Sequence, residues 1–78
     1  MITKTLIVVN GMTGQESPVQ VEEGATPPDI LRQLGLPNYQ LARVRNRQVL
    51  QPRCDVARVV GDGERLFAFA PMVVGGHL

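Results

Sequence analysis

Two short segments, one near each end of the chain, constrain the fold most, because neither has a polar face. Residues 5–9 are Thr-Leu-Ile-Val-Val, and residues 66–70 are Leu-Phe-Ala-Phe-Ala. β-branched and aromatic residues favour strands, and a strand that is apolar on both sides needs cover on both sides. We therefore expect two central strands that lie side by side in one sheet.

The residues that follow the first strand predict a hairpin and then a helix. Asn10 and Gly11 form a typical hairpin-turn pair, and residues 18–22 alternate apolar and polar side chains as an antiparallel strand does. We expect a helix that is capped by Thr26 and ends at Gly35. So short a helix is stable only when its apolar stripe packs on the sheet.

The next strand begins at Leu41 and alternates again. We expect Ala42 and Val44 to face the core, which directs Arg43 and Arg45 outward with Leu41 at the head of the same outer row. A short strand at residues 49–50, a loop with one helical turn in residues 52–60 and a tight turn at residues 61–63 complete the pattern. This order of elements predicts a two-layer α+β fold.

The last strand has two possible registers, and the sequence alone leaves both open. If Leu66, Ala68 and Ala70 face the core, then Phe67 and Phe69 face away from the helix. The opposite register buries the two rings. In the first case the rings add to an exposed, partner-binding surface; in the second they fill the core.

Length and composition exclude several classes of function. Seventy-eight residues make one small domain with little room for a catalytic cleft, and a net charge of +1 argues against non-specific nucleic-acid binding. The one cysteine, Cys54, precludes an internal disulfide and is expected to be structural, and Lys4 is expected to be solvated. The chain has no apolar run of about 18 residues and no signal-peptide pattern, so we expect a cytoplasmic protein without membrane contact.

The C-terminal residues carry the only evident reaction chemistry. Gly75 and Gly76 are followed by His77 and Leu78. Glycine has no Cβ, so a diglycine enters a channel that is too narrow for other residues. We therefore expect a folded domain over residues 1–71 and a flexible tail over residues 72–78.

The ordered set of short motifs along the chain resembles the β-grasp, ubiquitin-like proteins, in particular the sulfur carriers of thiamine and molybdopterin biosynthesis. The resemblance implies a mixed four- to five-stranded sheet with one helix packed across it. The matching residues are Val9-Asn10-Gly11, Glu23-Gly24-Ala25-Thr26-Pro27, Leu31-Arg32-Gln33-Leu34-Gly35-Leu36, Val44-Arg45-Asn46, Gln51-Pro52-Arg53, Asp62-Gly63-Glu64-Arg65-Leu66 and Pro71-Met72-Val73-Val74-Gly75-Gly76.

The resemblance implies a protein substrate and not an enzyme, without catalytic residues, bound cofactor or metal of its own. In such carriers an activating enzyme uses ATP-Mg to adenylate the carboxylate of the terminal glycine, here Gly76 after Gly75. The product becomes a thiocarboxylate that delivers sulfur to an acceptor synthase. The alternative is a bacterial ubiquitin-like modifier, which a conjugating enzyme joins to target proteins through Gly76. A third possibility is a β-grasp interaction domain with an inert tail.

The sequence departs from the usual carrier because His77 and Leu78 follow the diglycine. A processing protease must cleave between Gly76 and His77 before activation, and the resemblance implies a zinc metalloprotease. We also expect a monomer.

The activating enzyme should hold the chain at two places. The sheet face that carries Arg43, Arg45, Phe67 and Phe69 is expected to dock on it, because interface cores favour aromatic residues and arginine. The residues before the diglycine should lie in the channel of the enzyme that leads to its ATP site. These residues are Met72, Val73 and Val74.

Overall fold

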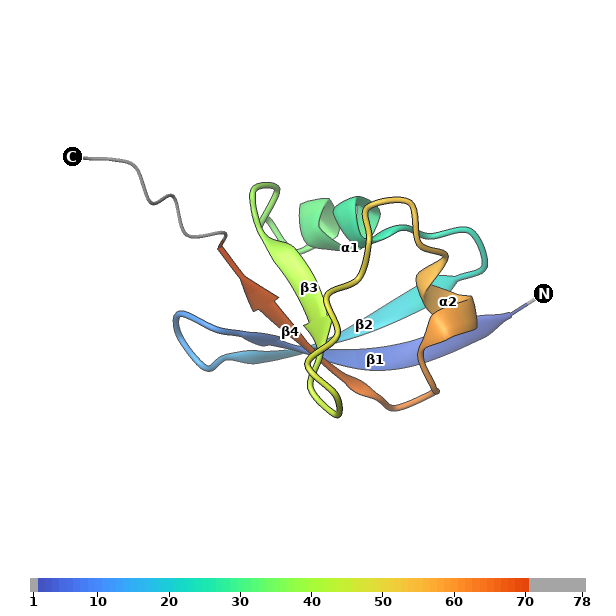
Figure 1. The fold of residues 1–78 in the computed structure, drawn as a ribbon, viewed down its shortest axis with the longest axis horizontal. Coiled ribbons are helices and arrows are strands. Elements are labelled where there is room, and N and C mark those ends of the chain that lie inside the picture. Colours follow the sequence, from blue (N-terminus) through green and yellow to red (C-terminus); the bar gives the residue numbers. More distant parts are fainter. Residues whose placement is uncertain (1, 71–78) are drawn as a thin grey trace.

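The computed structural model describes residues 2–70, which form one four-stranded sheet and two helices (Figure 1). The sheet order is β2-β1-β4-β3, in which β1 and β4 are parallel and the outer pairs are antiparallel. The two strands without a polar face are therefore central neighbours, as predicted. The elements are β1 (Thr3–Asn10), β2 (Glu16–Glu22), α1 (Pro27–Gln33), β3 (Gln40–Arg43), α2 (Val56–Val59) and β4 (Arg65–Phe69).

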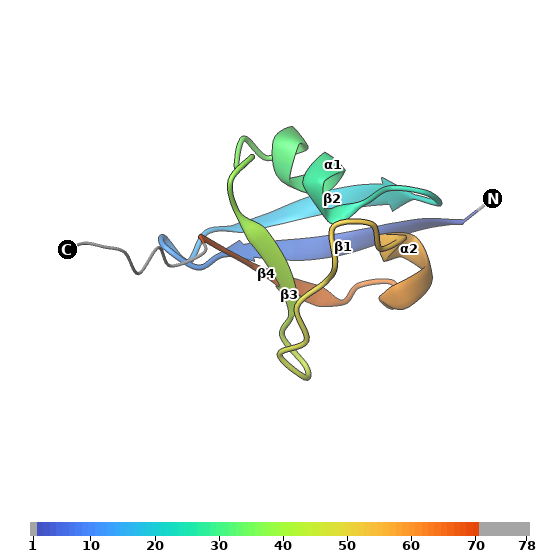
Figure 2. The same cartoon turned by 45° about the horizontal axis from the view of Figure 1, so that its top comes forward.

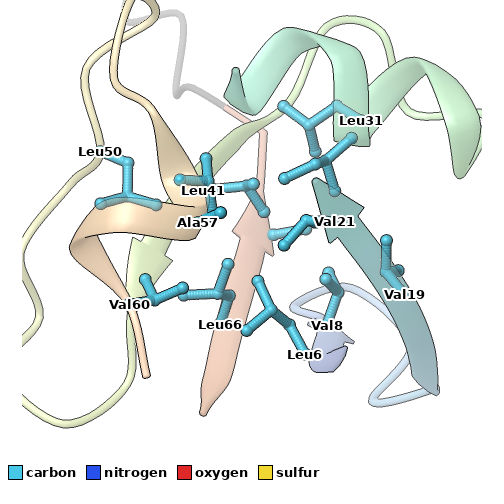
Figure 3. Packing of buried hydrophobic residues seen from close by; sticks show 13 residues of the cluster. Leu6, Val8, Val19, Val21, Leu31, Leu41, Leu50, Ala57, Val60 and Leu66 are labelled. Carbon is cyan, nitrogen blue, oxygen red and sulfur yellow. The ribbon is translucent and has the colours of Figure 1, made fainter. Parts of the chain in front are cut away.

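The core lies between the sheet and the two helices, which cover the same side of it (Figure 2). Val8 of β1 lies opposite Leu66 of β4, and both are buried. Figure 3 shows these side chains packed with Leu41 of β3 and Leu31 of α1. The arrangement confirms the α+β, β-grasp prediction of one helix packed across a mixed sheet.

Helix α1 begins and ends where the sequence predicts. The Asp29 carboxylate accepts hydrogen bonds from the backbone nitrogen of Thr26 at 3.1 Å and from its hydroxyl at 2.9 Å. These bonds, reinforced by the ion pair with Arg32, hold the pKa of Asp29 below its usual value. At the other end Gly35 takes a positive φ of 76°, a conformation that glycine adopts without a steric penalty.

The predicted facing of the third strand is wrong. Leu41 is fully buried opposite Ala68, and Arg43 lies opposite Leu66 on the same, helix-covered side. Val44 is instead 48% exposed, and Ala42 lies opposite Phe67 on the other side of the sheet. Leu41 buries more apolar surface in the core than Ala42 would. Arg43 can lie on the inner side of the sheet because its charge is paired with a partner there.

That partner is Glu64, in the loop before β4. Nε of Arg43 donates to Oε2 of Glu64 at 2.6 Å and Nη2 donates to Oε1 at 2.9 Å, so the pair is bidentate. Oε1 also accepts from the backbone nitrogen of Gly61 at 2.9 Å. Both side chains are shielded, with 13% of Arg43 and 10% of Glu64 exposed. The hydrogen bonds from Arg43 hold the pKa of Glu64 below its usual value despite partial burial.

This depressed pKa predicts how stability depends on pH. The contribution of Glu64 is complete above the unfolded-state pKa of about 4.3, and it is lost as the pH falls through the lower, folded-state pKa. We expect Glu64→Gln to cost about 1–2 kcal/mol at neutral pH and to flatten the acid dependence. Urea unfolding of both chains from pH 7 to pH 3 checks this. Glu22→Gln is the control, because Glu22 is exposed and forms no ion pair within residues 2–70; an equal loss in both variants contradicts the prediction.

Candidate functional site

The side of the sheet that faces away from the helices is uncovered within the described part of the chain, and we call it the open face (Figure 2). The register of β4 determines which side chains lie on the open face. Leu66 and Ala68 are fully buried on the helix side, whereas Phe67 is 39% exposed and Phe69 is half-buried. The first of the two registers left open by the sequence is therefore the observed one.

An apolar patch occupies the β3–β4 end of the open face. The rings of Phe67 and Phe69 stack with their centroids 6.1 Å apart and their planes at 24°. They line a hollow of about 400 Å³ together with valines from the segment after β3. The apolar patch consists of Ala42, Val44, Val49, Phe67 and Phe69.

Val49 reaches the patch because the chain folds back along the edge of β3. Ala42 and Val49 form an isolated antiparallel bridge, and the backbone nitrogen of Arg43 donates to the carbonyl of Gln48 at 2.8 Å. The turn between them places Arg47 in the left-handed region, with a φ of 59°. This short return makes a single bridge and not the strand predicted at residues 49–50, so the described sheet has four strands.

Arginines border the patch. Arg47 lines the hollow, and Arg45 is exposed in the turn that follows β3. Arg43 is neutralised by Glu64, but Arg45 and Arg47 form no ion pair with another residue in the range 2–70. The rim therefore carries two uncompensated positive charges beside an apolar centre, a composition typical of protein-binding surfaces.

Gly11 sets the position of the Phe67 ring. Its backbone nitrogen donates to the carbonyl of Ala68 at 2.7 Å, which brings the β1–β2 hairpin against the end of β4. A Cβ at this glycine would lie 2.6 Å from Cζ of Phe67 and 2.9 Å from the Ala68 oxygen. The absence of a side chain at Gly11 is thus a condition for the observed shape of the apolar patch.

We expect Gly11→Ala to displace the Phe67 ring and to destabilise the fold by about 1–3 kcal/mol, the usual cost of overpacking. Urea unfolding measures the loss. Gly61→Ala is the matched control, because its Cβ would meet nothing closer than Oε1 of Glu64 at 3.8 Å. An unchanged midpoint for Gly11→Ala would contradict this close packing.

The structure thus brings together only part of the site expected from the sequence. Phe67 and Phe69 lie side by side on the open face, whereas Arg43 is turned inward and Arg45 lies past the end of β3. Val44 and Val49 were not predicted as site residues, and the only sequence signal for Val49 was its position directly after the turn. The remaining expected site residues lie outside the described residues: Met72, Val73, Val74, Gly75, Gly76 and His77.

The described residues offer no other evident chemistry. Within residues 2–70, no group of three or more histidine, cysteine, aspartate or glutamate side chains is arranged to hold a metal ion. No helix in the same range has the length and apolar character needed to cross a membrane.

Comparisons with known proteins place the chain by its fold. No family model and no curated protein sequence matches it. Among solved structures it is similar to a ubiquitin of Caldiarchaeum subterraneum, with a TM-score of 0.71 over 94% of this chain and 99% of that one. The sequence identity is 15%, so the likeness is one of structure. The chain therefore has the ubiquitin-like β-grasp fold.

Proposed function

We propose that this protein is a ubiquitin-like carrier whose Gly76 carboxylate is activated by an ATP-dependent adenylating enzyme. The observation that carries the proposal is the combination of a ubiquitin-like body with a diglycine that ends six residues after Ala70. On this proposal the protein is a substrate and not an enzyme, binds no cofactor, acts in the cytoplasm and works as a monomer.

The chemistry explains why the tail needs glycine. A carboxylate reacts with a nucleophile only after one of its oxygens becomes part of a good leaving group, which adenylation provides. The ATP site of the enzyme must then admit the terminal residues of a folded protein. Gly75 and Gly76 have no side chains to clash with the walls of that site, and Met72, Val73 and Val74 lead into it.

The apolar patch is the proposed docking surface for the activating enzyme. It lies on β4, which is the strand that leads directly to the tail, so docking there holds the chain close to the ATP site. Phe67 and Phe69 form the apolar centre, and Arg45 and Arg47 supply charge at the rim. The position of the apolar patch on β4 supports the proposal, because a partner bound to β4 also determines the position of the residues that follow it.

We propose sulfur delivery as the fate of the activated carboxylate, on the basis of the motifs shared with sulfur carriers. Attack by a sulfur nucleophile on the acyl-adenylate then gives a thiocarboxylate for an acceptor synthase. The second candidate is conjugation to target proteins, and the residues that favour it are His77 and Leu78, since a removable extension is also found on ubiquitin precursors.

Both candidates require a chain that ends at Gly76. We expect co-expression with the processing metalloprotease and the activating enzyme to yield a protein that has lost His77 and Leu78. Intact-mass measurement then separates the two fates, because a thiocarboxylate gains the mass difference of sulfur over oxygen, whereas a conjugate gains the mass of a target. A chain that keeps both residues and is still adenylated or conjugated would overturn the proposal.

A further inference from the structure

We infer that the folded body of this protein is a poor acceptor for its own activated carboxylate, because its one side-chain amine, Lys4, is hydrogen-bonded to Val60 and lies toward the end of the sheet opposite to Phe69, where β4 ends. The inference rests on the proposed function, since it concerns what the activated Gly76 can react with. It predicts that the side chains of the folded body form few self-linked chains or rings.

The reaction to be avoided is aminolysis. A neutral amine attacks the carbonyl carbon of the acyl-adenylate or thioester, a C–N bond forms, and the bond to the phosphate oxygen or the sulfur breaks. AMP or a thiolate leaves with the bonding electron pair, and the proton of the amine passes to water. The product is an amide, which neither sulfur delivery nor transfer to a target can reverse.

Composition removes most of the possible acceptors. The chain has seven arginines and one lysine. An arginine keeps its proton near neutral pH, so it supplies positive charge without supplying a nucleophile. The uncompensated charges beside the apolar patch, Arg45 and Arg47, therefore attract a partner without reacting with an activated carboxylate.

The remaining amine is occupied. Nζ of Lys4 donates to the carbonyl oxygen of Val60 at 2.7 Å in a partly buried position, so the side chain is not the solvated one that the sequence suggested. To act as a nucleophile the amine must lose a proton and leave this carbonyl. Leaving the carbonyl gives up this hydrogen bond.

Sheet topology places this amine far from the tail. Lys4 lies three residues before Ile7, which pairs with Arg65, and Ala70 lies five residues beyond Arg65 on the parallel strand. Along the strand direction, Lys4 and Ala70 are therefore eight residues apart, or about 26 Å. The six residues from position 71 to position 76 span at most about 22 Å when fully extended. The tail of one molecule can therefore meet its own Lys4 amine only when the tail is fully extended and the lysine side chain also extends toward it, which breaks the contact with Val60.

The thiol is also restrained. Cys54 is partly buried against the core, and this burial, with the nearby carboxylate of Asp55, raises the pKa of its thiol. A protonated thiol is a weak nucleophile at neutral pH. The amine and the thiol of the described body, Lys4 and Cys54, are therefore both restrained from attacking the activated carboxylate.

The test uses a chemically activated chain, so it needs no enzyme. An N-terminally acetylated chain ending in a Gly76 thioester, made by intein cleavage, is incubated at pH 8, and amide products are identified by intact mass and peptide mapping. Gln40→Lys places an amine beside Phe69, the last residue of β4, within reach of the tail. Arg45→Lys places one on an exposed turn.

We expect Gln40→Lys to form a ring at least about tenfold faster than the parent forms any amide, because a short flexible link gives a high effective concentration. We expect Arg45→Lys to couple between molecules about tenfold faster than Lys4 does, the factor that corresponds to one charge-assisted hydrogen bond. Lys4→Arg should match the parent.

Coupling at Lys4 as fast as at position 45, or a parent ring closed through Lys4, would overturn the inference. So would a Gln40→Lys chain that stays open, because amine placement would then not control the reaction. The result is independent of the proposed function: an activating enzyme that ignores Gly76 would leave these rates unchanged.

Discussion

A chain with alanine in place of Gly76 is expected to show only background ATP–pyrophosphate exchange with its activating enzyme. The added methyl group would occupy space where the channel for a terminal diglycine has none, and adenylation requires the carboxylate to reach the ATP site. The substitution lies outside residues 2–70, in which the described sheet ends at Phe69. The free energy of unfolding should therefore change by less than about 0.5 kcal/mol.

The comparison needs chains that already end at residue 76, so that processing does not limit the assay. Thermal unfolding of the parent and of Gly76→Ala verifies that the fold is the same in both. Exchange by the alanine variant at the rate of the parent would mean that the enzyme does not read the terminal residue by its size.

The second large effect is expected at the apolar patch. Phe67→Ala should weaken binding to the activating enzyme by about 1–3 kcal/mol, since aromatic residues at the centre of an interface carry much of its energy. The loss of stability should be smaller than the 3–5 kcal/mol typical of a core phenylalanine, because 39% of Phe67 is exposed. Phe69→Ala should weaken binding to a similar degree, with a greater cost in stability because that ring is half-buried.

A titration with the activating enzyme and a urea melt on each variant separate the two effects. Val59→Ala is the matched control, because Val59 is 40% exposed but lies on α2, which covers the opposite side of the sheet. Equal binding by the parent and Phe67→Ala, or equal weakening by Val59→Ala, would remove the apolar patch as the docking surface.

The sequence predicted the central position of these strands because all their residues except Thr5 are apolar, but the expected cover on both sides is wrong, since within residues 2–70 the helices cover one side only. Residues 5–9 and 66–70 had no alternative to the middle of the sheet, and the structure pairs β1 with β4 there. Thr26 and Gly35 likewise mark the start and the end of α1. Helix caps could be predicted because they depend on adjacent residues only. The single helical turn expected between residues 52 and 60 is α2.

The facing of β3 could not be predicted in the same way. Leu41 and Arg43 share one side, Ala42 and Val44 share the other, and each pairing contains an apolar residue suited to a core. The deciding contact is made with Glu64, which lies 21 residues along the chain from Arg43 and receives its guanidinium at a shielded position. Alternation shows that every second side chain of a strand faces the same way. Which of the two sets faces the core is decided here by a residue far away in the sequence.

The apolar patch shows the same limit. Asn10 and Gly11 were correctly expected to turn the chain, and the structure adds a second role for the glycine. Its missing side chain admits the ring of Phe67, a residue more than fifty positions later. Such a contact depends on how the hairpin and β4 come together, which no local pattern encodes.

The central claim is that Gly76 is the residue activated, and ATP–pyrophosphate exchange on two chain lengths tests it most directly. One chain ends at Gly76 and the other keeps His77 and Leu78; both contain every residue of the described fold. We predict exchange with the chain that ends at Gly76 and none with the longer chain. Equal exchange with both chains, or none with the shorter one, would contradict the claim.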